Sequence, residues 1–295
     1  SGVRRMPPLF ICRATARNRS VVCFMDTRPI GVFDSGIGGL TVAREIMRQI
    51  PEERIVYFGD TARVPYGSKS GKTIIRYSCQ IARFLKTRGV KVIVVACNTA
   101  SAYALEALQQ EMDIPVIGVV RPGARVAARE SIGGNIGVIG TAATVGSHIY
   151  QKYIQSLRPE AQVFEKACPL FVPLVEEGWR KDPVTRIVAE RYLQEMKERK
   201  VDTLILGCTH YPLLRSMVAD IMGPDVVLVN PAYETAMELK QLLRRENIEN
   251  CGGSKIEENP YEFFVSDQAE KFRTFADSIL PIDITTAKQV PIEEY

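Results

Sequence analysis

Long hydrophobic runs, histidine and net charge are all scarce in this 295-residue sequence. No apolar run approaches the roughly 18 residues that a membrane-spanning helix needs, which argues against a membrane protein. The formal net charge of +4 comes from the first 28 residues, which hold six arginines and one aspartate. The remaining chain has 32 basic and 33 acidic residues. We therefore expect no electrostatic footprint for nucleic acid on the body of the protein.

The number and spacing of the seven cysteines do not indicate a disulfide framework. Their number is odd, the chain is long and their spacing is irregular, which together argue against a secreted disulfide framework. We expect a reducing, cytoplasmic environment in which most of the thiols pack as small apolar groups. The cysteines are Cys12, Cys23, Cys79, Cys97, Cys168, Cys208 and Cys251.

Residues 1–28 read as an extension of the globular chain. Ser1 and Gly2 lack an initiator methionine and look like an expression remnant, and Met6 and Met25 are both possible natural starts. The segment is rich in arginine and poor in acidic residues, as transit peptides are, but its apolar stretch at 7–12 is too short for a secretory signal. We expect a tag, or a disordered or regulatory extension.

From residue 29 onward, short β-branched runs alternate with longer amphipathic stretches. Strands that alternate with helices predict a mostly parallel sheet with helices on both faces. The expected strands are 30–33, 55–58, 92–96, 116–120, 136–139, 162–165, 203–206, 226–229 and 261–265. The expected helices are 40–49, 73–88, 100–111, 145–156, 183–199, 211–221 and 268–279, with a solvated connector at 247–259.

An internal repeat divides the chain into two similar units. An apolar strand precedes Ala-Cys-Asn-Thr around Cys97, and another precedes Gly-Cys-Thr-His around Cys208, 111 positions later. We expect two similar Rossmann-like or flavodoxin-like α/β domains, with the active site in the cleft between them and a break near 121–123. The expected division is 1–28 as the extension, 29–121 with 231–280 as the first domain, 122–230 as the second, and 281–295 as a C-terminal tail.

Cys97 and Cys208 stand where α/β proteins bind ligands. Each follows an apolar strand and precedes a helix, and ligands bind beyond the carboxyl ends of parallel strands. The partial positive charge of a helix N-terminus favours the thiolate, the form that accepts a proton. For either cysteine alone a structural role is an equal alternative, but two in matched settings favour a chemical role.

Polar residues gather at the same strand ends. Asp34 ends the first strand and His210 follows the second cysteine, and each can tune a thiol through charge or a hydrogen bond. Asp34 can alternatively cap the next helix. Further candidates lie in a glycine-rich turn suited to an anion, in a polar loop, and beside the cysteines. These candidates are Ser35, Pro65, Tyr66, Gly67, Asn98, Thr99, Thr141, Thr144 and Thr209.

Other chemistries fit the motifs less well. A cysteine phosphatase loop places arginine after five intervening residues, whereas six separate Cys208 from Arg215. The glycine-rich turn at 35–39 has neither the lysine of a phosphate-binding loop nor the spacing of a dinucleotide-binding turn. A zinc site of Cys97, Cys208 and His210 stays open, since two cysteines and one histidine form a known catalytic set.

Two facing thiols suit a racemase. Such an enzyme removes the α-proton from one face of its substrate and returns a proton to the other, and two acid–base groups spare one base from crossing the substrate plane. One group begins as thiolate and the other as thiol. Hydroxyl, amide and backbone donors are then needed to stabilise the carbanion when no cofactor serves as electron sink.

These motifs closely resemble those of glutamate racemases, in the aspartate/glutamate racemase family. The resemblance implies that Cys97 and Cys208 are the two acid–base catalysts, the first acting on the D-isomer and the second on the L-isomer. Asp34, His210 and Glu176 would assist them, with Asp34 beside Cys97 and His210 beside Cys208. The polar candidates named above, together with Asp34 and His210, would contact glutamate. The matching stretches are 31–41, 57–61, 65–67, 96–101, 140–144, 172–178, 207–212 and 263–267, within 29–280.

The same resemblance implies further properties. It predicts a cytoplasmic homodimer that needs no pyridoxal phosphate, metal or nucleotide, and that supplies D-glutamate for bacterial peptidoglycan, and hence for cell wall biogenesis and cell shape. Neither nucleic acid nor a membrane is an expected partner. Three alternatives stay open: an aspartate racemase or related two-thiol racemase, a non-catalytic binding protein on the same fold that sequesters a partner such as DNA gyrase, and a zinc hydrolase.

Overall fold

Two fully parallel sheets organise the protein in this computed structural model, which describes residues 26–251, 260–284 and 286–295. The predicted extension at 1–28 and connector at 247–259 therefore lie largely outside the described residues. The larger sheet has the order β10 (Ala287–Gln289), β9 (Tyr261–Val265), β2 (Ile55–Gly59), β1 (Ile30–Asp34), β3 (Val92–Val95) and β4 (Val116–Gly118). The smaller sheet has the order β6 (Gln162–Ala167), β5 (Asn135–Gly140), β7 (Thr203–Gly207) and β8 (Val227–Val229).

Helices cover both faces of each sheet, as expected for parallel strands. The expectation of two α/β units with mostly parallel sheets is confirmed, because every strand pairing described is parallel. The helices are α1 (Leu40–Gln49), α2 (Gly71–Thr87), α3 (Asn98–Tyr103), α4 (Leu105–Glu111), α5 (Val120–Glu130), α6 (Ala142–Gly146), α7 (Ile149–Leu157), α8 (Phe171–Glu176), α9 (Pro183–Glu198), α10 (Arg215–Met222), α11 (Pro231–Arg245) and α12 (Ala269–Asp277). Three short 3-10 turns are η1 (Tyr66–Ser68), η2 (Tyr211–Leu214) and η3 (Ile292–Glu294).

The hydrophobic core explains why the apolar runs form strands. Every residue of β1, β2, β3 and β7 is buried, so these strands read as continuous apolar runs and not as alternating ones. One cluster of buried residues joins α1, α11 and α12 on the larger sheet to α8, α9 and α10 on the smaller sheet. Separate clusters fill the opposite faces, beneath α2 and α4 and beneath α5 and α7. The two sheets therefore share a continuous core.

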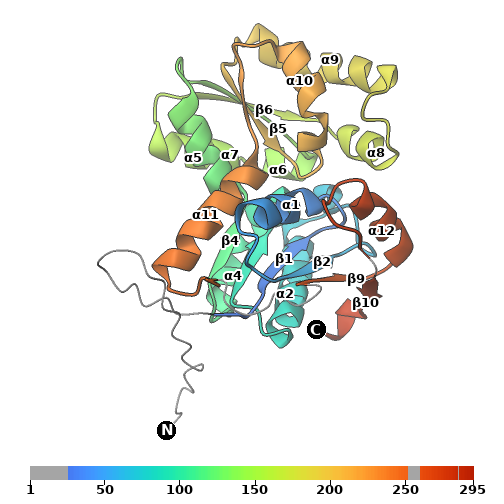
Figure 1. Cartoon of the computed structure of the whole chain (residues 1–295). Helices are drawn as coiled ribbons and strands as arrows, with labels where there is room; N and C mark the ends of the chain where they lie inside the picture. The colour runs from blue at the N-terminus through green and yellow to red at the C-terminus, as the bar shows by residue number, and fades with distance from the viewer. Residues whose placement is uncertain (1–25, 252–259, 285) are drawn as a thin grey trace, which may run out of the picture.

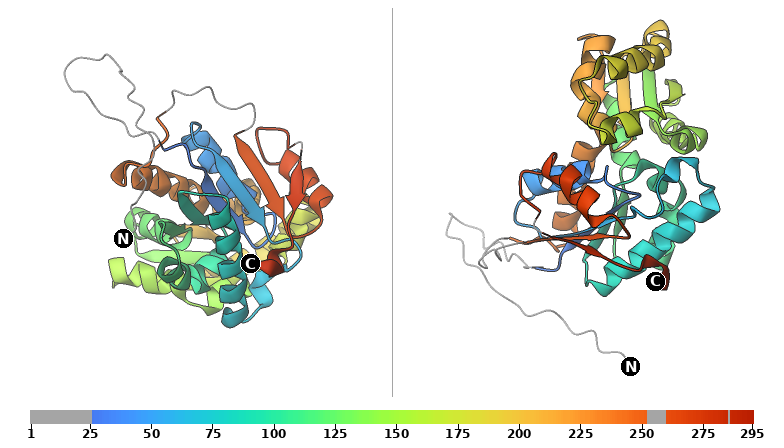
Figure 2. Two further views of the ribbon diagram at one scale, coloured as in Figure 1. Left: turned by 90° about the horizontal axis from the view of Figure 1, so that it is seen from below. Right: turned by 90° about the vertical axis from the view of Figure 1, so that its right-hand side faces the viewer.

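Two helices carry the chain between the sheets. In Figure 1, the smaller sheet lies above the larger one, and α11 runs down from it to pack against α1. The side view in Figure 2 shows the same two layers of strands, one above the other. Helix α5 packs against α11, and a Cβ added at Gly123 would lie 3.1 Å from Pro231 Cγ. The absence of a side chain at Gly123 therefore favours the close approach of these two connections.

The structure adds detail to two features of the expected organisation. The predicted break at 121–123 lies inside α5, because Pro122 stands in the first helical turn, where a missing N–H costs no hydrogen bond. The segment 281–295, named above as a C-terminal tail, contributes β10, which pairs in parallel with β9. Within the described residues, no helix is long and apolar enough to cross a membrane.

Candidate active site

Cys97 lies at the carboxyl end of β3 and caps the N-terminus of α3. Its sulfur accepts a hydrogen bond from the Ala100 backbone N–H at 3.4 Å and lies 3.4 Å from Ser35 Oγ. Burial and the negative charge of Asp34 raise the pKa of the Cys97 thiol to about 12, although the Ser35 and Ala100 contacts act in the opposite direction. Burial thus overrides the helix N-terminus, and Cys97 is a thiol at neutral pH.

Cys208 lies at the equivalent end of β7 and is the first member of a chain of three polar side chains. Its sulfur is 3.8 Å from His210 Nδ1, and His210 Nε2 is 3.1 Å from Glu176 Oε1, at the end of α8. Burial alone would lower the pKa of His210, but the contacts with Cys208 and Glu176 outweigh it and raise this pKa to about 10. The imidazole beside Cys208 is therefore protonated at neutral pH.

Glu176 is held in its ionised form by its neighbours. Burial acts to raise its pKa, but the His210 contact and the charge of Lys271, 3.9 Å away on α12, leave it lowered overall. Because α12 belongs to the part of the chain that builds the larger sheet, the ion pair at Glu176 also bridges the two sheets. The two cysteines consequently have different surroundings, one hydroxylic and one cationic.

Asp34 lies between these two sets of partners. Its side chain is 1% exposed, and its Oδ2 accepts a hydrogen bond from Gly36 N at 2.9 Å. Its Oδ1 is buried without a hydrogen-bond partner among the described residues. Burial raises its pKa, partly offset by the charge of His210. Asp34 therefore acts electrostatically on both Cys97 and His210, and not on one of them alone.

Three threonine hydroxyls meet at the junction of the two sheets. Thr99 Oγ1 lies 2.9 Å from Thr141 Oγ1 and 3.1 Å from Thr144 Oγ1. Thr99 follows Cys97 in α3, whereas Thr141 caps α6 after β5 and accepts a hydrogen bond from Thr144 N at 3.2 Å. These predicted contact residues are thus brought together from opposite halves of the site, and their hydroxyls can donate to an anionic ligand.

The glycine-rich turn after β1 packs tightly against the Cys208 turn. A Cβ added at Gly38 would lie 2.3 Å from Thr209 Oγ1 and 2.5 Å from His210 Nδ1, closer than atoms can approach. Thr41 Oγ1 also donates a 2.9 Å hydrogen bond to the Thr209 carbonyl. The glycine permits this close backbone approach, so the turn packs against the loop that carries Cys208 and positions it.

The loop 65–67 approaches the site through its backbone. Gly67 borders Thr141, since a Cβ added there would lie 3.0 Å from Thr141 Cβ. Tyr66 is fully buried behind the loop, and its hydroxyl donates to Asp60 Oδ2 at 2.5 Å. The phenol of Tyr66 is therefore engaged with Asp60, while Pro65 precedes it at the start of η1.

Two residues with structural importance for the site were given no role in the sequence analysis. Asp60 anchors the loop after β2 by accepting hydrogen bonds from Arg63, Tyr66 and Ser266. It follows β2 as Asp34 ends β1, and that equivalence is the signal that identifies it. Tyr150 donates a 2.6 Å hydrogen bond to Asn98 Oδ1, a contact that no sequence pattern indicates.

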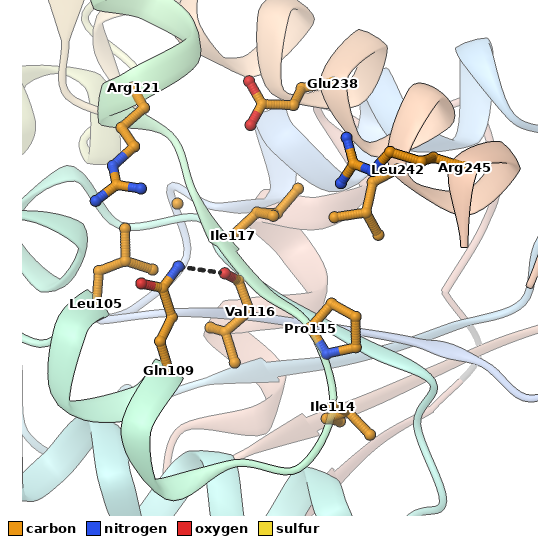
Figure 3. Close-up of a pocket in the computed structure, with 11 residues that line it drawn as sticks. Leu105, Gln109, Ile114, Pro115, Val116, Ile117, Arg121, Glu238, Leu242 and Arg245 are labelled. Atoms are coloured by element: carbon orange, nitrogen blue, oxygen red, sulfur yellow. Dashed lines mark hydrogen bonds between the residues drawn. The ribbon is translucent and has the colours of Figure 1, made fainter.

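Neither cysteine lines the pocket in Figure 3, of about 330 Å³, at the β4 edge of the larger sheet. Arg121, Glu238 and Arg245 stand around it, and Gln109 Nε2 donates to the Val116 carbonyl at 2.9 Å.

No group of three histidine, cysteine, aspartate or glutamate side chains in the described part of the chain is arranged to hold a metal ion. Among the described residues, Cys97, Cys208 and His210 are therefore not arranged as the three ligands that the zinc alternative needs.

Known proteins are similar to this one in sequence and fold over almost the entire described chain. The family model for Asp/Glu/Hydantoin racemase matches residues 30–238. A glutamate racemase of Geobacter metallireducens is 48% identical over 273 residues, which cover 91% of this chain and 98% of the relative. The crystal structure of a Francisella tularensis glutamate racemase in complex with D-glutamate is 38% identical, with a TM-score of 0.85 over 92% of this chain and all of that chain.

A second solved structure agrees with these relatives. The glutamate racemase isoform RacE1 of Bacillus anthracis is 40% identical, with a TM-score of 0.84 over 90% of this chain and 98% of that chain. The match in sequence spans both sheets and both cysteine turns. The chain therefore belongs to the Asp/Glu/Hydantoin racemase family, among its glutamate racemases.

Proposed function

We propose that the protein interconverts L-glutamate and D-glutamate by two-base proton transfer, with Cys97 and Cys208 on opposite faces of the α-carbon. The observation that carries this proposal is the matched pair of buried thiols at equivalent strand ends, each with its own partners. Relatives named as glutamate racemases, one of them in complex with D-glutamate, support glutamate as the substrate.

The different surroundings of the thiols suggest which one begins as thiolate and which as thiol when L-glutamate binds. From L-glutamate, Cys208 as thiolate accepts the α-proton, so that the C–H bond breaks and an S–H bond forms. Cys97, which is a thiol at neutral pH because its pKa is about 12, delivers its proton to the opposite face of the carbanion. The cationic His210 compensates negative charge on Cys208. From D-glutamate the two cysteines exchange roles.

Donors around the cysteines would hold the substrate and spread the carbanion's charge. Thr99, Thr141 and Thr144 form a hydroxyl cluster suited to one carboxylate. Ser35 and Asn98 lie beside Cys97, and Thr209 lies beside Cys208. Asp34, with an unpartnered carboxylate oxygen, suits the α-ammonium group, which would also offset the negative charge that keeps Cys97 protonated. Such fixed donors in a buried site stabilise developing charge strongly.

The cellular role follows from this activity. A mechanism that relies on two thiols needs both of them reduced, and Cys97 and Cys208 are free, although Cys251 is disulfide-bonded. This supports the cytoplasm as the location and the provision of D-glutamate for peptidoglycan as the role. A homodimer is the assembly that we expect from the family.

Polarimetric measurement of purified protein with L-glutamate tests the proposal. We expect the optical activity to decay to zero without any added cofactor, and D-glutamate to show the mirror-image decay. Faster racemisation of aspartate would favour the aspartate racemase alternative. Activity lost on chelator treatment and restored by zinc would favour a metal enzyme. If neither amino acid racemises, the non-catalytic alternative holds and the proposed function fails.

A further inference from the structure

Tyr150 of α7 contacts both cysteine turns. Its side chain is fully buried, and its ring lies against the end of β7, since a Cβ added at Gly207 would lie 3.3 Å from Tyr150 Cε2. Gly207 immediately precedes Cys208. The hydroxyl at the tip of the ring donates a 2.6 Å hydrogen bond to Asn98 Oδ1, and Asn98 immediately follows Cys97. One rigid side chain thus spans the two halves of the site.

The direction of this hydrogen bond fixes the orientation of the Asn98 amide. Burial, reinforced by the negative charge of Cys208, raises the pKa of Tyr150, so the phenol stays protonated and donates. An amide that accepts through Oδ1 keeps its two N–H groups free to donate elsewhere. Asn98 is 4% exposed at the start of α3 and lines a small buried space together with Cys208 and Thr209, so the Tyr150 hydrogen bond holds its amide in one orientation between the two cysteine turns.

We propose that Tyr150 is a positioning residue for racemisation, whose hydroxyl holds the Asn98 amide so that its N–H groups donate to a carboxylate of glutamate. This inference rests on the proposed function. Tyr150 comes from the part of the chain around the smaller sheet, whereas Asn98 follows a strand of the larger sheet. The bond therefore forms only when the two cysteine turns are correctly apposed, and substrate binding depends on that apposition.

The Tyr150→Phe variant tests the role of the hydroxyl, because it keeps the ring against Gly207. We expect KM to rise about tenfold for both isomers, the loss typical of one buried hydrogen bond, with little change in kcat because Asn98 would hold the same carboxylate equally in the bound substrate and in the carbanion. Calorimetric titration with D-glutamate should show the same loss of affinity without turnover. Tyr153→Phe, on the same helix with its hydroxyl on Arg121, is the matched control and should keep the wild-type KM.

A double-mutant cycle separates this role from a general structural one. In an Asn98→Ala background, Tyr150→Phe should change the affinity for D-glutamate no further, because its only route to the substrate is already removed. An equal loss in both backgrounds, or an unchanged KM in the single variant, would overturn the inference. A wild-type protein that does not racemise glutamate would instead refute the proposed function, so the two failures are distinguishable.

Discussion

Replacing Glu176 by glutamine isolates the charge that keeps His210 protonated. The glutamine retains an oxygen that can accept the 3.1 Å hydrogen bond from His210 Nε2 but removes the negative charge. A charge-assisted hydrogen bond is worth about 1–2 kcal/mol more than a neutral one. Because the Glu176 side chain is 25% exposed, solvent screening favours the lower end of that range. We therefore expect the pKa of His210 to fall by about one unit.

The kinetic consequence can be measured directly. We expect kcat/KM of Glu176→Gln to stay near the wild-type value at neutral pH, where His210 remains protonated, and to be about tenfold lower than in the wild type above pH 10, by the same factor in both directions because the two enantiomers are equal in free energy. In the wild type, His210 stays protonated up to a pKa of about 10, so activity should fall only near that pH. In the variant, the alkaline fall should move to lower pH. The measurement is the initial rate of racemisation across pH 6 to 11 (chosen to bracket the pKa).

The stability of the protein should change with pH in the same sense. The folded-state pKa of His210 lies above its usual value of 6.5, so its stabilising contribution is complete below that pH and is lost as pH rises through about 10. Glu177→Gln is the matched control, because Glu177 is the exposed neighbour of Glu176. If Glu176→Gln kept the wild-type rate and pH profile while the control did the same, the proposed action of Glu176 through His210 would be refuted.

Two further variants test the fold and the site. Lys91 and Glu53 form an ion pair of 2.6 Å, and both side chains are fully buried. Because Lys91→Met removes the cation that faces the Glu53 carboxylate, urea unfolding should show a free energy of unfolding lower by about 3–5 kcal/mol. The double variant Lys91→Met with Glu53→Leu should recover much of that loss. Equal stability of single variant and wild type would contradict that. Gly38→Ala should reduce kcat about 100-fold, because the added Cβ would displace His210. Gly146→Ala, where the added Cβ meets nothing within 4 Å, should remain active, and wild-type activity in Gly38→Ala would show that this close approach is dispensable.

The strands were predictable because parallel strands are buried on both faces. Such strands appear as unbroken apolar runs, and the expected ranges agree with those of β1, β2, β3 and β7 within one residue at each end. The short β10 was not predictable, because Ala-Lys-Gln at the edge of a sheet has no apolar signal. Helix α5 was missed because Arg-Pro-Gly reads as a chain break unless the proline is known to stand in the first turn.

The site was only partly predictable for a different reason. Residues adjacent to the cysteines in sequence, such as His210, could be recognised from the motifs alone. The high pKa of Cys97 could not, because the helix N-terminus indicates a thiolate, and only the degree of burial reverses that expectation. Contacts across the two sheets, such as the packing of Gly38 on Thr209 and the Tyr150 hydrogen bond, depend on how the domains meet. The spacing of residues along the sequence does not indicate how the two domains pack against each other.

The most direct test of the two-base mechanism is racemisation of L-glutamate in deuterated water by Cys97→Ser and Cys208→Ser. A serine hydroxyl is too weak an acid–base group to replace a thiol at neutral pH. We therefore expect each variant to lose racemisation, as followed by circular dichroism and α-proton exchange. Cys79→Ser, which changes a buried free cysteine in α2, should stay active. Near-wild-type turnover by either Cys97→Ser or Cys208→Ser would contradict the mechanism.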